Sequence, residues 1–405
     1  MSTSGPTSFA EYELPSPPQD PVSALAFNPN HSADKARQLL VSSWDRLVRF
    51  YDLTGSTDTN SVRLLKTFQH DAPVLDVCWI NDGLAASGGV DRRVRLLNLE
   101  TGQSRIIGKH NQAVSRLRFS PATGLLLTGS WDRTIKIWDP FNVESGQALL
   151  KTLEMPDKVL AMDLSPPFPS APMDARSVSA SANGATVEPD RTPRAVIAMT
   201  GRTVHIYELN RIKETLERVK KGEEVEEKDF EPDQRRESSL KFMLRDVKCM
   251  PAGDGYATSS VEGRIAVELF DPTPESQSKK YAFKCHRQNV DGIDTVYPVN
   301  CMSFHPVHGT FASLGGDAVC SIWDAAAKKR IRQYPRLPSP LSASCFSSDG
   351  AVLAIASGAE NIEDTRHQGP GAGEVGEVGR GGEGNVRIHI KPAWEDCKPK
   401  LKTSA

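Results

Sequence analysis

The sequence lacks the motifs of most catalytic and metal-binding proteins. Its seven cysteines are odd in number and include no CxxC pair, which argues against a zinc site or a disulfide framework and favours reduced thiols in an intracellular protein. It has no HExxH motif, no glycine-rich phosphate loop before a helix, and no serine, cysteine or carboxylate pair in a catalytic arrangement. We therefore expect a protein that is not an enzyme and that needs neither a metal nor a cofactor.

Charge of one sign and long apolar runs are also missing. The formal net charge is −2 over 405 residues, which argues against direct DNA binding, so any basic site must be local. The longest apolar runs have the length of a strand, which excludes a membrane-spanning helix. The first twenty residues are polar and proline-rich and contain no signal-peptide core. This composition is typical of a soluble globular protein.

What the sequence does contain is a repeat. Residues 128–139 (TGSWDRTIKIWD) predict the end of one strand, a tight turn and an alternating strand, and similar stretches occur at 41–52, 87–98 and 313–324. The turn aspartates Asp45, Asp91 and Asp132 are 46 and 41 residues apart. A period of about 40–45 residues with a closing Trp-Asp is the signature of a propeller blade. The pattern predicts an all-β, seven-bladed propeller.

The blades account for most of the chain. Residues 1–20 form an N-terminal arm in which a strand at 8–14 is expected to complete the last blade, since closure removes exposed sheet edges; the alternative is a disordered tail. The propeller spans 21–390, and residues 391–405 are expected to be a disordered tail. The first strands of the blades are expected at 23–27, 74–79, 114–119, 159–164, 242–250, 299–304 and 342–346.

Three insertions interrupt this repeat. Residues 165–193 are rich in Ser, Pro and Ala, and 359–384 are rich in Gly and Glu, so both are expected to be flexible surface segments. In 210–236, Ile212, Leu216 and Val219 are spaced as on one face of a helix among charged residues. This spacing predicts a charged surface helix. The helix either only connects two strands through solvent or binds a partner protein.

Histidines and turn aspartates of the repeats suggest a buried structural network. His110, Ser130, Asp132 and Trp138 can form a chain of hydrogen bonds from the indole N–H to the carboxylate, and His70 begins a similar set. A third set contains His286, Asp317 and Trp323 and is expected to be incomplete, because glycines stand where the serine would be. We interpret these sets as structural rather than catalytic.

Two tryptophans and a group of cations are the candidate binding residues. Trp44 and Trp131 precede the turn aspartates, where a large aromatic side chain is either a binding anchor or packing between blades. Blade five has Glu-Gly-Arg (262–264) in place of Trp-Asp-Arg, and cations crowd this region. Such a cluster suits an acidic or phosphorylated peptide, the alternative being surface salt bridges. The cations are Arg235, Arg236, Lys241, Arg245, Arg264, Lys284 and Arg287.

Glu268 lies inside an apolar strand of the same blade. A buried carboxylate needs a partner, and a neighbouring arginine is the simplest one.

Several motifs resemble a known family, the seven-bladed WD40 proteins of the mitotic spindle checkpoint (the small Bub propeller) and their sibling, the mRNA-export propeller. The resemblance covers nearly all of 20–390 outside the insertions and rests on 235–241, 271–275 and 280–287. Residues 41–45, 237–239 and 271–275 resemble the checkpoint member, whereas 305–310 (HPVHGT) resemble the export member. The insertions 165–193 and 369–384 depart from the compact family pattern.

The resemblance implies a non-catalytic adaptor in the nucleus, at kinetochores in mitosis, that works as a monomer within a hetero-complex. The family's propeller face holds the GLEBS motif of a checkpoint kinase and of its pseudokinase relative, and Arg245 and Arg264 match the arginines that meet its acidic residues. The loaded propeller then recognises phosphothreonine in MELT repeats of the kinetochore scaffold, a role that Lys284 and the nearby Arg287 and Lys241 match. The partner-peptide positions also include Trp44, Trp131 and Glu268.

Two other functions remain open at this point. The export sibling would hold a nucleoporin through the same kind of motif and touch RNA, which would need a wider basic face than a net charge of −2 favours. A substrate receptor of a ubiquitin-ligase complex would need a ligase-docking segment, and the sequence contains none that we can identify.

Overall fold

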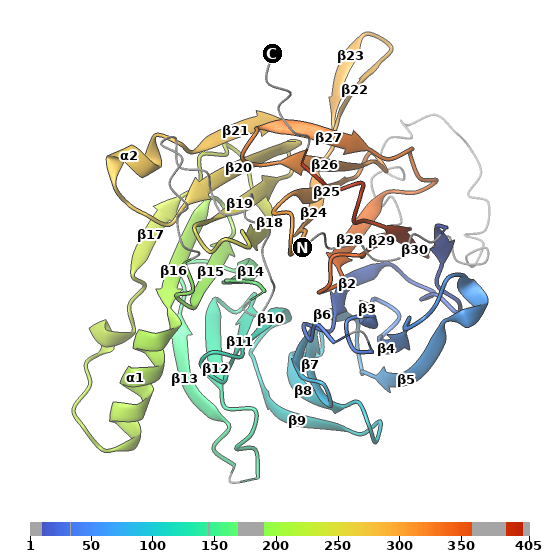
Figure 1. Cartoon of the computed structure of the whole chain (residues 1–405). Coiled ribbons are helices and arrows are strands. Elements are labelled where there is room, and N and C mark those ends of the chain that lie inside the picture. Colours follow the sequence, from blue (N-terminus) through green and yellow to red (C-terminus); the bar gives the residue numbers. More distant parts are fainter. Residues whose placement is uncertain (1–9, 33, 145, 169–189, 359–385, 400–405) are drawn as a thin grey trace, which may run out of the picture.

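The computed structural model describes residues 10–32, 34–144, 146–168, 190–358 and 386–399. In this part of the chain, seven four-stranded antiparallel sheets surround a central axis like the blades of a propeller (Figure 1). The fold is therefore the seven-bladed propeller that the repeat predicted. The longest helix has 12 residues, and no helix among the described residues is long and apolar enough to cross a membrane.

The strands follow the chain blade by blade, from the axis outward. The first three blades contain β2 (Val22–Phe27), β3 (Gln38–Ser43), β4 (Leu47–Asp52) and β5 (Arg63–Gln69); β6 (Val74–Asn81), β7 (Leu84–Gly89), β8 (Arg93–Asn98) and β9 (Ser104–Lys109); and β10 (Val114–Ser120), β11 (Leu125–Ser130), β12 (Thr134–Trp138) and β13 (Leu149–Glu154). Blade four contains β14 (Val159–Ser165), β15 (Arg194–Met199), β16 (Thr203–Glu208) and β17 (Gln234–Glu237).

Blades five to seven continue this order. They contain β18 (Leu244–Cys249), β19 (Gly255–Ser260), β20 (Arg264–Leu269) and β21 (Tyr281–Lys284); β24 (Val299–Phe304), β25 (Phe311–Gly315), β26 (Cys320–Asp324) and β27 (Lys329–Gln333); and β28 (Leu341–Phe346), β29 (Val352–Ser357), β30 (Arg387–Pro392) and β1 (Tyr12–Glu13). A separate hairpin of β22 (Arg287–Val290) and β23 (Ile293–Val296) projects from the ring between blades five and six (Figure 1). The short helix α2 (Pro274–Gln277) lies between β20 and β21.

The N-terminal strand closes the ring. Tyr12 and Glu13 of β1 pair antiparallel with Ile390 and His389 of β30, so the fourth strand of blade seven comes from the opposite end of the chain. This is the position that the sequence predicted for the strand at 8–14, of which residues 8 and 9 lie outside the described residues. Leu14 is 3% exposed, and its burial anchors the arm.

The core lies between the blades rather than within one layer. The second strands β3, β11, β19 and β29 are buried at every residue because each blade is covered by a neighbour on both faces. For example, Phe50 of blade one packs edge-on against Trp79 of blade two, with 5.7 Å between the ring centroids. Continuous burial explains why these strands do not alternate strictly between apolar and polar residues.

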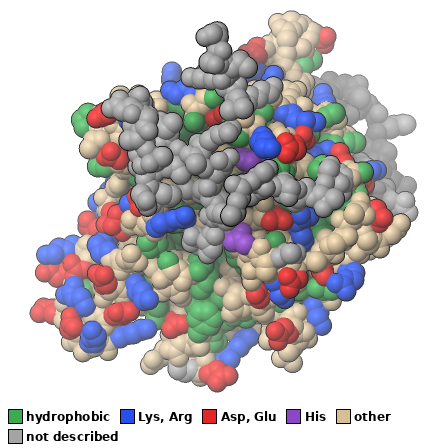
Figure 2. Space-filling model, viewed as in Figure 1, with side chains coloured by type: hydrophobic (Ala, Val, Ile, Leu, Met, Phe, Trp, Pro, Cys, Tyr) green, Lys and Arg blue, Asp and Glu red, His purple; other side chains and the backbone are tan. Residues whose placement is uncertain are grey.

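The insertion after β16 forms a helix that packs on blade four. In α1 (Leu209–Lys220), Leu209, Ile212 and Leu216 are buried beside Phe230 of the 3₁₀ turn η2 (Glu227–Phe230), whereas Val219 is 48% exposed. Acidic and basic side chains intermix over this region in Figure 2. The helix was predicted, but Val219 does not belong to its buried face, and the insertion ends before β17 begins at Gln234.

The C-terminal boundary also differs from the sequence interpretation. A disordered tail from 391 was predicted, but this is wrong for residues 391–399, because β30 extends to Pro392 and Cys397 is fully buried. Thr310 donates a hydrogen bond to the carbonyl oxygen of Cys397 over 2.8 Å, which fixes the segment against blade six. Most of the 165–193 insertion (169–189) and all of 359–384 lie outside the described residues.

The predicted histidine network exists, with a different hydroxyl. Trp138 donates from Nε1 to Thr128 Oγ1 over 2.8 Å, Thr128 lies 2.8 Å from His110 Nε2, and His110 Nδ1 lies 3.2 Å from Asp132. Ser130 is not part of this chain, because it ends β11 beside the turn and there accepts the N–H of Asp132. The hydroxyl that links the indole to His110 therefore belongs to Thr128, two residues farther from the turn than the sequence interpretation placed it.

The set in blade six is complete, contrary to the prediction. Ser313 accepts the indole N–H of Trp323 and lies 2.8 Å from His286 Nε2, while His286 Nδ1 lies 2.9 Å from Asp317. Ser313 is the counterpart of Thr128. The glycine that misled the sequence interpretation is Gly315, where a Cβ would lie 2.2 Å from both the Asp317 carboxylate and the His286 ring.

Burial decides the protonation state of His110 in the blade-three set. It lowers the pKa of His110 to about 4, although the Asp132 carboxylate opposes the shift. His110 is therefore neutral at pH 7, and its Nδ1–H donates to Asp132 while Nε2 accepts the Thr128 hydroxyl.

We expect Thr128→Val to lower the free energy of unfolding by about 1–3 kcal/mol, because the Trp138 indole N–H and the His110 ring nitrogen both lose their buried partner. Urea unfolding followed by tryptophan fluorescence measures the change. Thr67→Val, an isosteric substitution at an exposed position of β5, should stay within about 0.5 kcal/mol of the wild type. Equal effects of the two substitutions would contradict a role for the network.

Candidate functional site

One face of the ring carries the tight turns between the second and third strands of the blades. The first residue of each turn bonds through its N–H to the loop that precedes the blade, as Trp44 does to the Pro21 carbonyl, Trp131 to that of Ala113 and Val261 to that of Met243, over 3.0–3.1 Å. The turns and the interblade loops therefore lie on the same side, which we call the turn face. The predicted site residues lie on it, with the exception of Glu268 and of Arg235 and Arg236 in β17.

The blade-five turn was predicted one residue out of register. The position with positive φ in these turns is held by Arg46, Arg92, Arg133 and Ala318 (φ 60–70°), and in blade five by Gly263 (φ 59°). Glu262 therefore stands where other blades have Asp45, Asp91, Asp132 or Asp317, and Arg264 is the counterpart of Arg93. A side chain at Gly263 would meet the carbonyl oxygens of Cys285 and Tyr297 at 2.7 and 2.9 Å, so glycine is needed there.

Three of the predicted cations come together around this turn, and we call Arg264, Lys284 and Arg287 the basic cluster. Arg264 of β20 and Lys284 of β21 are directly opposite each other in register, so two like charges share one face of the sheet. Arg264 Nε lies 3.3 Å and Arg287 Nη2 lies 3.7 Å from the Glu262 carboxylate, and Arg287 Nη1 donates to Asp294 over 2.9 Å. Like charges held opposite each other are unfavourable for stability alone, so the arrangement favours a role in anion binding.

Two further cations lie on the turn face close by in the fold. Arg245, the second residue of β18, is exposed and donates to Asn300 Oδ1 over 3.1 Å. Lys241 is exposed in the loop that leads into blade five. Both belong to the entrance of blade five, on the side of the ring that carries the basic cluster.

Arg235 and Arg236 do not belong to the site. They lie in β17 of blade four, where Arg235 pairs with Glu231 at 3.1 Å and Arg236 donates to the Phe270 carbonyl oxygen over 2.7 Å. Arg236 thus ties the outer strand of blade four to blade five. The sequence interpretation grouped them with blade five because they are near it in the chain.

Glu268 is an internal residue. It is 4% exposed and accepts hydrogen bonds from the Tyr256 hydroxyl over 2.9 Å and from the Ser239 N–H over 3.2 Å. Burial, reinforced by the Glu268 charge, raises the pKa of the Tyr256 phenol. The expectation of an arginine partner is wrong in this respect, since tyrosine and a backbone amide satisfy the carboxylate among the described residues. Its position does not offer the carboxylate to a peptide on the face.

Exposed apolar side chains also lie on the turn face. Trp44 is 46% exposed and Trp131 is half-buried, and the loop into blade five adds Phe242 (51% exposed) and Met243 (41% exposed). The sequence interpretation assigned Phe242 and Met243 to a strand, but β18 begins only at Leu244. Two large apolar residues directly after Lys241, in a segment flanked by cations, were the signal that could have revealed them as surface anchors.

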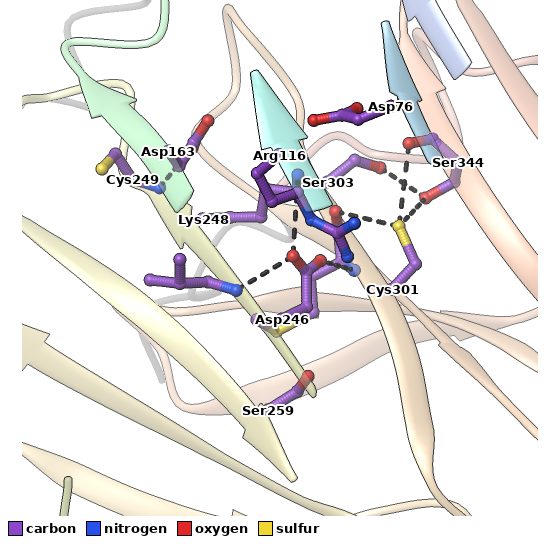
Figure 3. A network of polar contacts seen from close by, with 12 residues as sticks. Asp76, Arg116, Asp163, Asp246, Lys248, Cys249, Ser259, Cys301, Ser303 and Ser344 are labelled. Atoms are coloured by element: carbon purple, nitrogen blue, oxygen red, sulfur yellow. Dashed lines mark hydrogen bonds and ion pairs between the residues drawn. The ribbon is translucent and has the colours of Figure 1, made fainter. Parts of the chain in front are cut away.

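The axis of the ring is lined by a second polar group, which is structural. Asp76, Asp163 and Asp246 each accept a backbone N–H from the inner strand of the next blade, over 2.8 Å in each case. Figure 3 shows the contacts of Asp163 and Asp246. Arg118 pairs with both Asp76 and Asp163, and a cavity of about 260 Å³ lies beside them. These contacts satisfy the three carboxylates. No group of side chains that could hold a metal ion occurs in the described ranges. The three carboxylates therefore lock the inner strands together.

Comparison with known proteins defines the class. The family model "WD domain, G-beta repeat" matches residues 11–52, 62–98, 102–139 and 278–324. The solved structure of U3-55K superimposes with a TM-score of 0.63 at 15% identity, covering 94% of this chain and 98% of that chain, which supports the fold alone. The protein is a seven-bladed WD40 β-propeller.

Relatives along the whole chain define the family. Mitotic checkpoint protein BUB3.1 of Arabidopsis thaliana is 39% identical and covers 98% of this chain and 97% of its own length. Mitotic checkpoint protein bub3 of Dictyostelium discoideum is 35% identical (88% and 91%), and the Poly(A)+ RNA export protein of Schizosaccharomyces pombe is 32% identical (85% and 83%). The chain belongs to the Bub3/Rae1 family of non-catalytic WD40 propellers and is Bub3-like in sequence.

Proposed function

We propose that the protein is a non-catalytic adaptor of the spindle assembly checkpoint. The turn face would hold the GLEBS motif of a checkpoint kinase and of its pseudokinase relative, with Arg245 and Arg264 of blade five meeting acidic residues and Trp44 of blade one and Trp131 of blade three supplying apolar contact. The observation that carries this proposal is the gathering of exposed cations and exposed apolar side chains on one rigid face of a Bub3-like chain. Rigid placement limits the ordering cost of binding.

Recognition of phosphothreonine would use the same surface. A phosphothreonine of the kinetochore scaffold brings close to two negative charges and three acceptor oxygens. Lys284 and Arg287 adjoin Arg264 around the blade-five turn, and Lys241 lies on the loop beside it. We infer that these cations receive the phosphoryl group, with the protein acting as a monomer within a hetero-complex in the nucleus and at mitotic kinetochores.

The export sibling is the alternative, because the Poly(A)+ RNA export protein is nearly as similar and residues 305–310 resemble it. In the structure, however, His305 and Thr310 are buried and bond to the Gly350 and Cys397 carbonyl oxygens. That motif packs the C-terminal segment and does not lie on the turn face. It therefore carries little weight in the choice of partner.

Imaging of the tagged protein in dividing cells separates the two functions. We expect accumulation at unattached kinetochores, with loss of the signal in Arg264→Ala. A signal that stays at the nuclear envelope, together with retention of polyadenylated RNA in the nucleus on depletion, would favour the export function.

A further inference from the structure

The carboxylate of the blade-five turn behaves differently from its counterparts. In four other blades the turn aspartate caps its own turn by accepting the N–H two residues on, over 3.0–3.2 Å; these pairs are Asp45 with Leu47, Asp91 with Arg93, Asp132 with Thr134 and Asp317 with Val319. Glu262 is one methylene longer, and its carboxylate instead faces the side chains of Arg264 and Arg287. The turn has lost its cap, and the basic cluster has gained an internal anion.

The contacts that Glu262 makes are poor hydrogen bonds. It lies 3.3 Å from Arg264 Nε and 3.7 Å from Arg287 Nη2, both beyond the 2.7–2.9 Å of a strong charged hydrogen bond. The Nε atoms of Arg264 and Arg287 are buried without a hydrogen-bond partner in the described structure. Glu262 therefore neutralises charge but leaves donors unsatisfied, a state that favours exchange for a better acceptor.

The geometry points to Glu262 as an internal competitor for the anion site: its carboxylate lies against Arg264 and Arg287 in the free protein and is displaced when a phosphoryl group binds between them. This inference rests on the function proposed above. A phosphoryl group displaces Glu262 more readily than a ligand carboxylate does, because it brings a second charge and a third oxygen. Glu262 thereby lowers the affinity of the site for every anion, and a phosphoryl group retains the greater affinity.

The surroundings allow this exchange. The Glu262 side chain is 27% exposed, so it can swing into solvent while its backbone N–H stays on Ser260 Oγ over 3.3 Å. Lys284 is exposed opposite Arg264 and makes no ion pair within the described ranges, so it can add a third contact. Arg287 also pairs through Nη1 with Asp294, so the three cations with both carboxylates carry a net charge of +1, and displacement of Glu262 raises it to +2.

Fluorescence anisotropy with two labelled peptides tests the inference, one containing phosphothreonine in a MELT-type sequence and one with Glu at that position. Because Glu262→Gln removes the competitor, we expect it to bind both peptides about fivefold more tightly than the wild type. Glu262→Asp should also tighten binding, because the shorter side chain can cap the turn as in the other blades and leave the arginines. Since Glu262→Asp keeps the net charge, a change in overall charge cannot explain that result.

Each outcome decides a different point. If the wild type binds the phosphopeptide and Glu262→Gln binds it equally or more weakly, Glu262 positions the arginines and the competition is wrong, while the proposed function stands. If Glu262→Gln tightens binding and Glu262→Asp does not, the effect is one of net charge and the competition is likewise wrong. If neither the wild type nor any variant binds the phosphopeptide, the proposed function fails at this surface. Thermal unfolding midpoints within about 2 °C of the wild type establish that each variant is folded.

Discussion

Replacing Arg118 with Met is expected to lower the free energy of unfolding by about 3–5 kcal/mol, because it leaves the Asp76 and Asp163 carboxylates in the ring interior without their shared cation. Arg118 Nη1 lies 2.7 Å from Asp76, and Nε lies 3.3 Å from Asp163, so one side chain of blade three joins blades two and four. Burial alone would lower the pKa of Arg118, but the two carboxylates outweigh it and raise the pKa, which keeps the guanidinium charged.

Urea unfolding of the purified variant measures this loss. Arg116→Met is the matched control, because Arg116 lines the same cavity but donates to the carbonyl oxygen of its own neighbour, Ser115. It should cost less than about 1 kcal/mol. Adding Asp76→Asn and Asp163→Asn to Arg118→Met should recover part of the stability, since the uncompensated charges are then gone. Equal losses for Arg118→Met and Arg116→Met would refute the bridging role.

Arg264→Ala has the largest expected effect on binding. We expect the affinity for an acidic GLEBS-type peptide to fall by at least about 2 kcal/mol, or about thirtyfold, because the peptide loses a charged donor and Lys284 remains as the only cation of the β20–β21 pair. Arg245→Ala should have a similar effect, while Lys284→Ala should mainly weaken binding of the phosphorylated peptide. Titration calorimetry with the purified propeller measures all three.

The control for Arg264→Ala is Arg93→Ala. Arg93 holds the equivalent position after the blade-two turn, where it pairs with Asp71. Its removal should change peptide affinity by less than about twofold. If both alanine variants lose affinity alike, the effect is that of the overall charge of the turn face, and blade five has no special role.

The sequence predicted the architecture because a propeller repeats the same physical solution. Alternating strands, a closing Trp-Asp and a period near 41–46 residues determine the blades, and the helix from Ile212 to Leu216 follows from its spacing. Contacts that depend on how far a residue lies from the turn along its strand were less predictable. Thr128 rather than Ser130 meets the Trp138 indole because of its depth in the strand, which the order of residues does not reveal.

The site was predicted in part. The cations of blade five were identified from their density, but chain proximity also drew in Arg235 and Arg236, which the sheet places in blade four. The register of the 262–264 turn depends on which residue adopts positive φ, and Gly263 became recognisable only beside its counterparts. The structure places Glu268 in the interior, and the binding roles of the other site residues remain predictions.

The measurement that tests the central claim most directly is a pull-down from mitotic cells with the tagged wild type and Arg264→Ala, analysed by mass spectrometry. The account predicts that the wild type recovers a checkpoint kinase and the kinetochore scaffold and that Arg264→Ala recovers neither, although both proteins are folded and equally expressed. Identical partners for the two proteins would contradict the assignment of binding to blade five, and a nucleoporin with bound RNA in place of the kinase would contradict the checkpoint function.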